Sequence, residues 1–427
     1  MAASYLISSD YLPSVQTGDL TGMTQNNIAS QHLAEQAAQA EVISHLRQKY
    51  DTTKEFTPTA PWNPSGVSLA NYPTRTALTA AAWVANTSYT VGQFVEWTDS
   101  NIYQCILLNN DATFISAHWI NLGATGSIPY QANDRIYLSA QGYSSGITYA
   151  LNALVIYNAP WVASTSYTLN QQILYTDGNI YMCAIANSDT TFTPAKWRQV
   201  GPQSYIGAVY VCTTAIVAPE AFNPAHWTLA GQCNSIFYGA LPPNVTAFDY
   251  SNGYYVTGNQ VYYKGLVYSC IIGTRYPDHT EELQVETTTG VIAGNVFPDD
   301  PSNGSKCWGI GIPYYIPKGT PITNTLYWTA GDNRDVDLVS RMVDITAYRL
   351  SKNIAPKNIP DKLIFAYMGA DNDKTHFTGK MFYPLYSALG WLQGCARGEI
   401  TPNLPLLQPT QGSRIRFSSK PRQINNY

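Results

Sequence analysis

The sequence predicts a multidomain α+β protein in which small antiparallel all-β modules interrupt a helical domain. Aromatic-rich, strand-like repeats fill the middle of the chain, and helical patterns flank them at both ends. Neither end has enough helices to bury its own apolar side chains, so we expect residues 1–56 and 328–427 to fold as one split helical domain. Such an insertion is tolerated at a surface loop, because the chain ends there can lie close together.

The first helical block covers residues 1–56. Thr24 or Asn26 can cap a helix that runs to about Tyr50. The expected apolar stripe consists of Leu33, Ala37, Val42, Leu46 and Tyr50, widened by Ile43. The polar face consists of Glu35, Gln36, Gln39, Arg47 and Gln48. Residues 57–80 are rich in proline and predict a linker.

A near-duplicate occupies the middle of the chain. The stretch Trp83–Thr90 returns as Trp161–Thr168, and Phe114–Trp119 returns as Phe192–Trp197, each time 78 residues later. A constant offset predicts two copies of one folding unit. Alternating apolar and polar residues between Gly or Asn turns predict that each copy consists of short antiparallel strands.

Related but degraded material surrounds the two clear copies. Tyr210–Cys212 with Phe222–Trp227 matches only the second half of the repeat. Tyr255–Val261 with Tyr268–Cys270 matches the first part, and Cys307-Trp308 can close it. The expected domains are 81–158 for the first repeat, 159–250 for the second repeat with a degenerate half repeat, and 251–327 for a third, degenerate module.

The second helical block covers residues 328–427. Asp332 can cap a helix to about Lys352, which the prolines at 356 and 360 end. A short helix over 361–367 and a third over about 381–397, ended by Gly398, follow. The side chains expected to point inward are Val336, Val339, Val343, Leu350, Phe382, Leu385, Leu389, Leu392 and Ala396.

Composition restricts the class of protein. Only 12% of the residues are charged, whereas 32 are tyrosine, which is typical of β-rich, turn-rich surfaces. The net charge of −4 gives no general attraction to nucleic acid. The seven cysteines form no CxxC pair, and Cys105, Cys183 and Cys270 recur at strand ends, which predicts packed thiols.

Neither export nor membrane insertion is expected. Residues 1–5 lack the basic and apolar regions of a secretory signal. No stretch approaches the 18 apolar residues of a membrane span.

Catalytic and metal-binding patterns are missing from the sequence, so we expect no enzyme, no metal and no cofactor. There is no HExxH, no GxSxG and no P-loop. The pairs Glu281-Glu282 and Asp299-Asp300 resemble a glycosidase pair only in residue type, and adjacent acids on a polar loop are far more often solvated. The histidines are scattered: His32, His45, His118, His226, His279 and His376.

Three aromatic residues are candidate glycan contacts. Sugar rings stack on flat aromatic side chains, while amides and hydroxyls bind the ring edges. Trp97, Tyr175 and Tyr263 stand at equivalent strand positions, where surface contact and plain packing are both open. The other repeat tryptophans are expected in small β cores: Trp83, Trp119, Trp161 and Trp197.

The chain ends in a basic segment with interleaved apolar residues. We expect it to dock on a neighbouring protein as an added strand or arm, with Ile415 and Phe417 as anchors. Contact with DNA in a channel is the alternative, since phosphate contact needs only Lys and Arg. The residues of this docking arm are Arg414, Ile415, Arg416, Phe417, Lys420 and Arg422.

The helical ends resemble the head–tail connector proteins of tailed phages, in particular the Mu-like neck protein family. The likeness covers about 150 residues and lies in Tyr5–Tyr11, the helix from Ile28 to Tyr50, Asp332-Asn333-Arg334 and Trp391-Leu392. It implies a homo-oligomeric ring of twelve copies under the portal protein, next to other tail rings and in transit contact with packaged DNA. It also implies a place in the virion neck, after assembly in the bacterial cytoplasm.

The repeats resemble the family five and twelve carbohydrate-binding modules of chitinases. The shared pattern is Trp83, Tyr89 to Gly92, Tyr103, Cys105 and Trp119, with Asn170 in place of the glycine in the second copy. Where the enzyme-borne modules carry exposed aromatics, this chain has aliphatic residues at 106–108 and 184–186. The expected function is therefore a structural virion protein with outward modules. The alternative is a phage adhesin, or a head or tail fibre, that binds host surface glycans.

Overall fold

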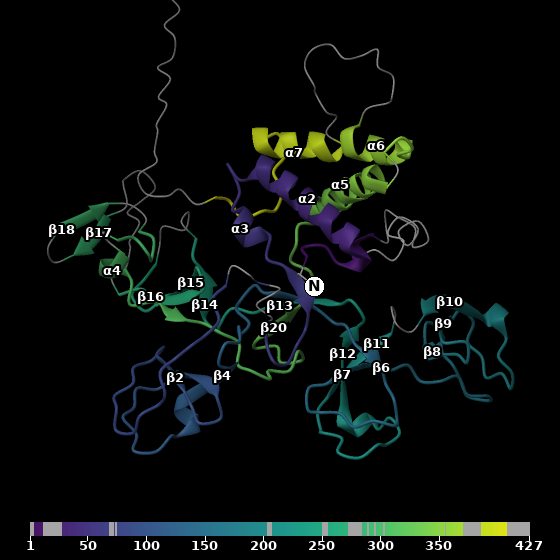
Figure 1. Ribbon diagram of the computed structural model, residues 1–427, viewed down its shortest axis with the longest axis horizontal. Helices are drawn as coiled ribbons and strands as arrows, with labels where there is room; N and C mark the ends of the chain where they lie inside the picture. The colour runs from purple at the N-terminus through teal and green to yellow at the C-terminus, as the bar shows by residue number, and fades with distance from the viewer. Residues whose placement is uncertain are drawn as a thin grey trace, which may run out of the picture.

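The computed structural model describes residues 4–11, 28–67, 72, 75–202, 207–249, 255–271, 284–287, 290–293, 296–301, 304–354, 356–369 and 386–407. Helices gather at one end of the molecule and several small sheets spread from the other (Figure 1). The predicted class, a mixed α+β protein with small antiparallel sheets, is confirmed. No helix in these described ranges has the length and apolarity needed to cross a membrane.

Residues from both ends of the chain share one hydrophobic core. The helices are α2 (Ile28–Leu46), α5 (Val336–Ile354), α6 (Asp361–Met368) and α7 (Ala388–Arg397), with a 3-10 turn η1 (Ser8–Tyr11) and a short α3 (Thr52–Glu55). Val42 and Leu46 of α2 pack in the same cluster as Met342 of α5 and Trp391 of α7. We call this part the helical unit.

Val42, Leu46 and Tyr50 are buried as predicted, but the first half of α2 turns a different face inward. Leu33 is 62% exposed, and the buried positions are Ala34, Ala38, Val42 and Leu46, spaced by four residues. Glu35, expected on the polar face, is buried, and it accepts a hydrogen bond of 2.7 Å from the Tyr11 hydroxyl. An alanine-rich helix offers little contrast between its faces, so small differences in packing decide which face is inward.

Helices α5 and α7 begin later than expected. Asp335, rather than Asp332, caps α5: its Oδ1 accepts from the Leu338 backbone N–H at 2.8 Å. Val336, expected to point inward, is 81% exposed in the first turn. Ser387 caps α7, accepting from Gly390 N–H at 3.1 Å.

The end of α7 follows the prediction more closely. Gly398 ends the helix in the left-handed conformation, with φ of 83°. Cys395 is buried in place of the expected Ala396, which is exposed. Phe382 and Leu385 lie outside the described residues.

A four-stranded central sheet carries the modules. Its order is β1 (Thr59–Pro61), β5 (Arg135–Tyr137), β13 (Ile236–Gly239) and β20 (Trp328–Ala330). These strands begin at residues 59, 135, 236 and 328, because modules fill the stretches between them. The predicted linker at 57–80 therefore contributes strand β1 and Trp62, which packs in the core of this sheet.

The two clear repeats fold as separate three-stranded modules. Module A (residues 81–125) contains β2 (Phe94–Glu96), β3 (Asn101–Cys105) and β4 (Trp119–Ala124). Module B (residues 159–202) contains β8 (Gln172–Leu174), β9 (Asn179–Cys183) and β10 (Trp197–Pro202). Gly92 and Asn170 take the same positive-φ turn, with φ of 92° and 67°, which explains the exchange of Gly for Asn.

Module C is split by module B. Strands β6 (Gln141–Gly142) and β7 (Leu154–Ile156) pair in one sheet with β11 (Ala208–Cys212) and β12 (Trp227–Gln232). The half repeat seen in the sequence at 210–227 is thus completed by residues 141–156. Module B is inserted between β7 and β11, where module A has only the turn at 97–100. The sheets therefore do not follow the boundary expected between 158 and 159.

Module D begins earlier than the expected boundary at 251. Its sheet contains β14 (Val245–Ala247), β15 (Gln260–Tyr263), β16 (Leu266–Ser269) and β19 (Ile312-Pro313). A separate hairpin of β17 (Gln284–Thr287) and β18 (Gly290–Ala293) and the short helix α4 (Gly304–Cys307) belong to the same stretch. The bridge between Cys270 and Trp308 repeats the pairing of Cys105 with Trp119, so Trp308 closes this module.

The cysteines are packed thiols, as predicted. All seven are unbridged, and Cys105, Cys183 and Cys270 are buried at the end of the equivalent strand. Cys212 holds the same position in module C. Burial raises the pKa of the Cys105 and Cys212 thiols, which keeps them protonated and inert.

Candidate functional site

Modules A, B and C each contain a stack of three aromatic rings. In module A, Trp97 stacks on Phe114 at 4.2 Å between ring centroids, and Phe114 stacks on Trp119 at 5.5 Å. In module B, Tyr175 stacks on Phe192 at 3.9 Å. One face of Trp97 and one face of Tyr175, two of the three candidate glycan contacts, are therefore covered by phenylalanine.

Module C supplies an equivalent residue that sequence reasoning missed. Tyr157 follows β7 as Trp97 follows β2, and it stacks on Phe222 at 3.7 Å with 6° between the ring planes. The signal was the aromatic residue directly after the apolar run 154–156. It was hidden because the rest of the module resumes only at residue 207.

The repeat tryptophans fall into two groups. Trp119 and Trp197 are buried in the module cores, as expected, and so is Trp227. Trp83 and Trp161 are only partly buried, because they lie edge-on against Phe114 and Phe192 at the rim of each core.

A basic side chain precedes the closing tryptophan in modules A, B and C, and it contacts an acid each time. His118 lies 2.7 Å from Asp111, and Lys196 lies 2.8 Å from Asp189. In module C the pair is His226 with Glu220, at 2.7 Å. Exposed pairs of this kind contribute little stability. They position the loop before the last strand, and the exchange of His for Lys keeps the contact with an acid.

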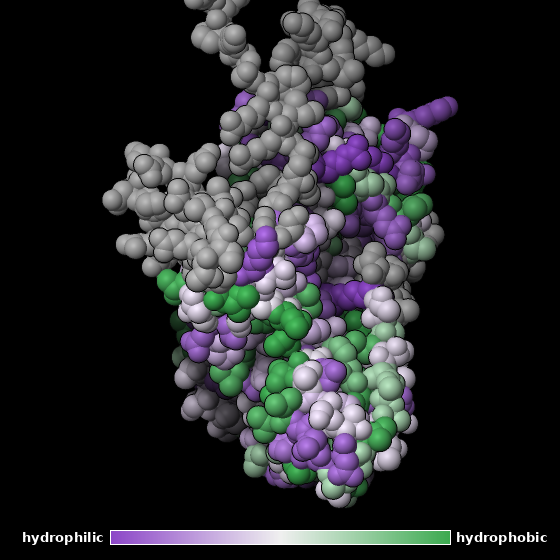
Figure 2. All heavy atoms as spheres, turned by 90° about the vertical axis from the view of Figure 1, so that its left-hand side faces the viewer, coloured by the Kyte–Doolittle hydropathy of each residue, from purple (hydrophilic) through white to green (hydrophobic). Residues whose placement is uncertain are grey.

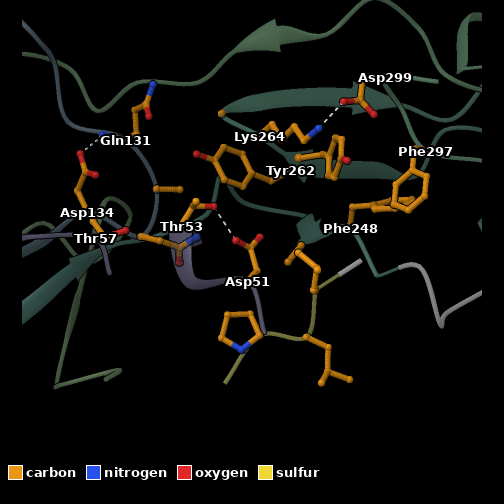
Figure 3. Close-up of a pocket in the computed structure, with 18 of the residues that line it drawn as sticks. Asp51, Thr53, Thr57, Gln131, Asp134, Phe248, Tyr262, Lys264, Phe297 and Asp299 are labelled. Carbon is orange, nitrogen blue, oxygen red and sulfur yellow. Dashed lines mark hydrogen bonds and ion pairs between the residues drawn. The ribbon is translucent and has the colours of Figure 1, made fainter. Parts of the chain in front are cut away.

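The third candidate, Tyr263, lies in a different environment. It lines a cavity of about 680 Å³ where module D meets the central sheet and the helical unit (Figure 3). Phe248 lies edge-on to Tyr263 at 5.3 Å, and Phe297 lies at 6.0 Å with a tilt of 34°. The helical unit contributes Asp51 and Thr53 to the lining, and the Thr53 hydroxyl donates to Asp51 Oδ1 at 2.6 Å.

The inner wall of this cavity is a buried ion pair. Arg75 donates to both carboxylate oxygens of Asp134, and Asp134 also accepts from the Gln131 backbone N–H at 2.8 Å. The Arg75 guanidinium lies 4.4 Å from the centre of the Tyr72 ring. Burial opposes the charge of Arg75, but the hydrogen bond and the charge of Asp134 outweigh it and raise the pKa of Arg75.

The outer wall is a turn of module D. Lys264 has φ of 47° and Gly265 has φ of 85°, so the two residues form the tight hairpin turn between β15 and β16. The Lys264 ammonium lies 2.6 Å from Asp299 Oδ2 and 5.0 Å from the centre of the Tyr263 ring. The hydrogen bond to Asp299 raises the pKa of Lys264 and holds it charged. Asp299 therefore acts as the ion-pair partner of Lys264.

A buried charged network joins the helical unit to the central sheet. The Arg334 guanidinium, 1% exposed, donates to the two oxygens of Asp10 at 2.7 and 2.9 Å and to Asp332 at 2.6 Å. Burial works against the Arg334 charge, yet the bonds to Asp332 and Asp10 raise its pKa well above the ordinary range. The sequence assigned no role to this arginine beyond the family likeness.

A second arginine extends the network into the sheet. Arg135 of β5 donates to the Glu55 carbonyl at 2.5 Å and to Asn333 Oδ1 at 2.6 Å. The Tyr5 hydroxyl donates to Glu55 Oε1 at 2.5 Å. Burial raises the pKa of Tyr5, and the neighbouring Glu55 raises it further. The beginning of the chain, α3, the central sheet and the start of α5 are thus fixed to one another.

The remaining sequence candidates are not brought into a site. The docking arm, Glu281-Glu282, His279 and His376 lie outside the described residues. His32 lies 3.2 Å from Glu35 in α2. Within the described part of the chain, no three or more His, Cys, Asp or Glu side chains are placed to hold a metal ion.

The comparisons with protein families and curated proteins give no relative on which to base a function. The chain matches no protein-family model and no curated protein. The proposed function therefore rests on the geometry of this chain: a helical unit at one end, modules at the other, and a polar cavity between them.

Proposed function

We propose that this chain is a structural subunit of the neck of a tailed bacteriophage. In this proposal the helical unit is the split connector domain, which assembles as a ring under the portal protein, and the β modules project outward. The observation that carries the proposal is the separation of the two parts (Figure 1). The two chain ends share one helical core, and modules A to D attach through the central sheet on its other side.

The surface of the helical unit suits a ring. Leu33 of α2 and Val336 of α5 are exposed, and Phe365 of α6 stacks on Tyr386 at 5.2 Å while both remain about half exposed. Apolar side chains on the surface favour contact with another subunit. A ring needs two different faces that meet head to tail, and the family likeness implies twelve copies.

The exposed surfaces of the β modules suit binding to other molecules rather than catalysis. Figure 2 views the side that bears modules A and D, and apolar residues are exposed on the lower part of that face. The exposed apolar side chains of module A include Val84, Val91, Ile106, Leu107, Leu108 and Ile115. They fit contact with host glycans or with other virion proteins, without any chemistry of their own.

The proposal includes the partners that the family likeness implies. These are the portal protein, the neighbouring tail ring and, in transit, the packaged DNA, with the docking arm at 414–422 as the contact segment. The described chain leads toward this arm from the helical unit, where the Leu407 N–H donates to the Lys49 carbonyl at 2.9 Å. The protein is then located in the virion neck, after assembly in the host cytoplasm.

The mass of the assembled particle tests this function. We expect native mass spectrometry of the full chain to give a closed ring near twelve copies. Leu33→Glu and Val336→Glu should reduce the ring to monomers without lowering the melting temperature, because both side chains are exposed. The matched control, Leu107→Glu on module A, should keep the ring.

Two results would contradict the proposal. A trimer of the unaltered chain favours the alternative, an adhesin or fibre that binds host glycans. Loss of the assembly in Leu107→Glu, with the helical variants still assembled, would show that the modules, not the helices, hold the subunits together.

A further inference from the structure

We propose that the cavity between module D, the central sheet and the helical unit is a binding site for a short neutral saccharide. The cavity encloses about 680 Å³, within the range of about 300–1,000 Å³ typical of ligand sites. Its lining combines aromatic rings with carboxylates, an amide and an ammonium group. This combination is the one that sugars need, because their C–H faces pack on rings while their hydroxyls take hydrogen bonds.

The aromatic side of the cavity distinguishes Tyr263 from its counterparts in the other modules. Trp97 and Tyr175 each have one face covered by a parallel phenylalanine, at 4.2 and 3.9 Å. Among the described residues, Tyr263 has no such parallel neighbour at stacking distance, since Phe248 meets it edge-on and Phe297 is tilted away at 6.0 Å. The strand position that is filled by packing in modules A and B is therefore open to the cavity in module D.

The polar side is supplied by residues far apart in the sequence. Asp51 and Thr53 approach from α3, and Lys264 with Asp299 faces them across the cavity in Figure 3. Carboxylate oxygens accept hydrogen bonds from sugar hydroxyls, and the lysine ammonium donates to them. The Lys264 ammonium lies over the Tyr263 ring, 5.0 Å from its centre, so a sugar packs on the part of the ring that Lys264 leaves uncovered and has this donor beside it.

The charge of the lining selects against acidic sugars. The cavity residues carry four carboxylates, on Asp51, Asp134, Asp299 and Asp300, against the two cations Arg75 and Lys264. A uronate or a phosphorylated sugar would meet net negative charge, so the site favours a neutral glycan.

The cavity lies where three parts of the fold meet. Its walls belong to the helical unit, the central sheet and module D, so a bound sugar bridges the three. We expect binding to raise the melting temperature of the full chain, as any ligand of the folded state does. The inference does not rest on the neck assignment, because a chain that forms no ring can still bind sugar at this cavity.

The test uses the full chain and three trisaccharides: chitotriose, maltotriose and the acidic trigalacturonate. Isothermal titration calorimetry should detect at least one neutral trisaccharide, and Tyr263→Ala should weaken it at least tenfold. Asp299→Asn, a change at the rim of the cavity, should weaken it severalfold. Trp97→Ala and Tyr175→Ala, at the equivalent positions of modules A and B, are the matched controls and should leave the affinity within twofold.

Three outcomes would overturn the proposal. The first is that neither neutral trisaccharide binds, and the second is that trigalacturonate binds more tightly than both. The third is that the two control variants lose as much affinity as Tyr263→Ala does. Circular dichroism melts show whether each variant is still folded. If Tyr263→Ala unfolds module D, Asp299→Asn remains as a test of the same cavity. Native mass spectrometry of the same samples reports the ring separately, so failure of the sugar site is distinguishable from failure of the neck assignment.

Discussion

Arg334 binds both carboxylate oxygens of Asp10, at 2.7 and 2.9 Å, although the two residues are 324 positions apart. Both side chains are buried. The pair closes the helical unit, because Asp10 follows the first residues of the chain and Arg334 precedes α5. The ion pair thus fixes the segment before α2 to the segment that leads from the modules into α5.

The first prediction concerns this ion pair. Arg334→Met leaves the Asp10 charge buried without its partner, and the loss of one member of a buried pair costs roughly 3–5 kcal/mol. We expect urea unfolding of the full chain, followed by helical circular dichroism, to show this loss. The control is Arg397→Met at the exposed pair with Glu399, where the change should stay below about 1 kcal/mol. Equal effects at both positions would refute the structural role of the buried pair.

The second prediction concerns the module cores. Trp119→Ala and Trp197→Ala remove buried rings, so each should destabilise its own module by roughly 3–5 kcal/mol. Trp83→Ala and Trp161→Ala, at the partly buried rim, should cost clearly less. Tryptophan fluorescence during denaturant unfolding of the full chain separates the modules from the helices. Unchanged stability after loss of Trp119 or Trp197 would indicate that these rings serve as surface platforms and would favour glycan binding by the modules.

The third prediction concerns the split module. Module B fills the connection between β7 and β11, which in module A is a turn of four residues. Replacement of residues 158–206 by such a turn should therefore leave module C folded, with Trp227 still buried and the melting temperature of the helical unit unchanged. Exposure of Trp227, seen as a red-shifted emission relative to the full chain, would show that module C needs module B.

The split of module C also marks what the sequence did not reveal. The offset of 78 residues identified modules A and B, because both copies are continuous. The two halves of module C are separated by module B, and a short apolar run such as 154–156 does not identify its distant partner strand. The pairing of β7 with β11 is a tertiary contact, which is seen only in the folded chain.

The helices show the same division between local and tertiary information. Prolines at 356 and 360 and Gly398 are local signals, and α5, α6 and α7 end within two residues of the predicted positions. The inward face of α2 was misassigned at Leu33, because alanines on several faces make the choice depend on contacts with α5 and α7. The cavity had no local signal beyond Tyr263, since Asp51, Asp134 and Asp299 come from three separate parts of the fold.

The fourth prediction concerns Asp344 and pH. Burial raises the pKa of this α5 carboxyl to about 6, although Arg341 nearby lowers it. The folded state then binds the proton more tightly than the unfolded state, whose carboxyl titrates near about 4. The contribution of Asp344 is therefore fully favourable below about pH 4 and is lost as the pH rises through about 6.

Asp344→Asn should accordingly stabilise the chain at pH 7, and this gain should shrink steadily between about pH 6 and pH 4. The measurement is the difference in urea midpoint between variant and unaltered chain at a series of pH values. Arg341 keeps its hydrogen bond to the Tyr386 carbonyl at 2.9 Å, so the variant does not leave it isolated. A gain that grows as the pH falls would contradict the direction of the pKa shift.

The last prediction concerns the docking arm. Truncation after Thr410 removes Arg414, Ile415, Arg416, Phe417, Lys420 and Arg422. The truncated chain should still fold, because α7 ends at Arg397 and Leu404 is the last residue of the helical core in the described part of the chain. If the arm docks on a neighbour, the truncated protein should fail to stay on the portal or the next ring. Reversal of charge at Arg414 and Arg416 should weaken docking in a salt-sensitive way.

The DNA alternative predicts a different defect from the same truncation. Necks assemble, but filled heads lose their genome, because the contact that is lost is with phosphates rather than with protein. Counting complete necks and DNA-filled heads in the same micrographs separates the two explanations. Necks missing from the particles support docking, and complete necks on emptied heads support retention of DNA. Particles that are both complete and full would exclude both roles, because the arm would then be dispensable for assembly and for holding the genome.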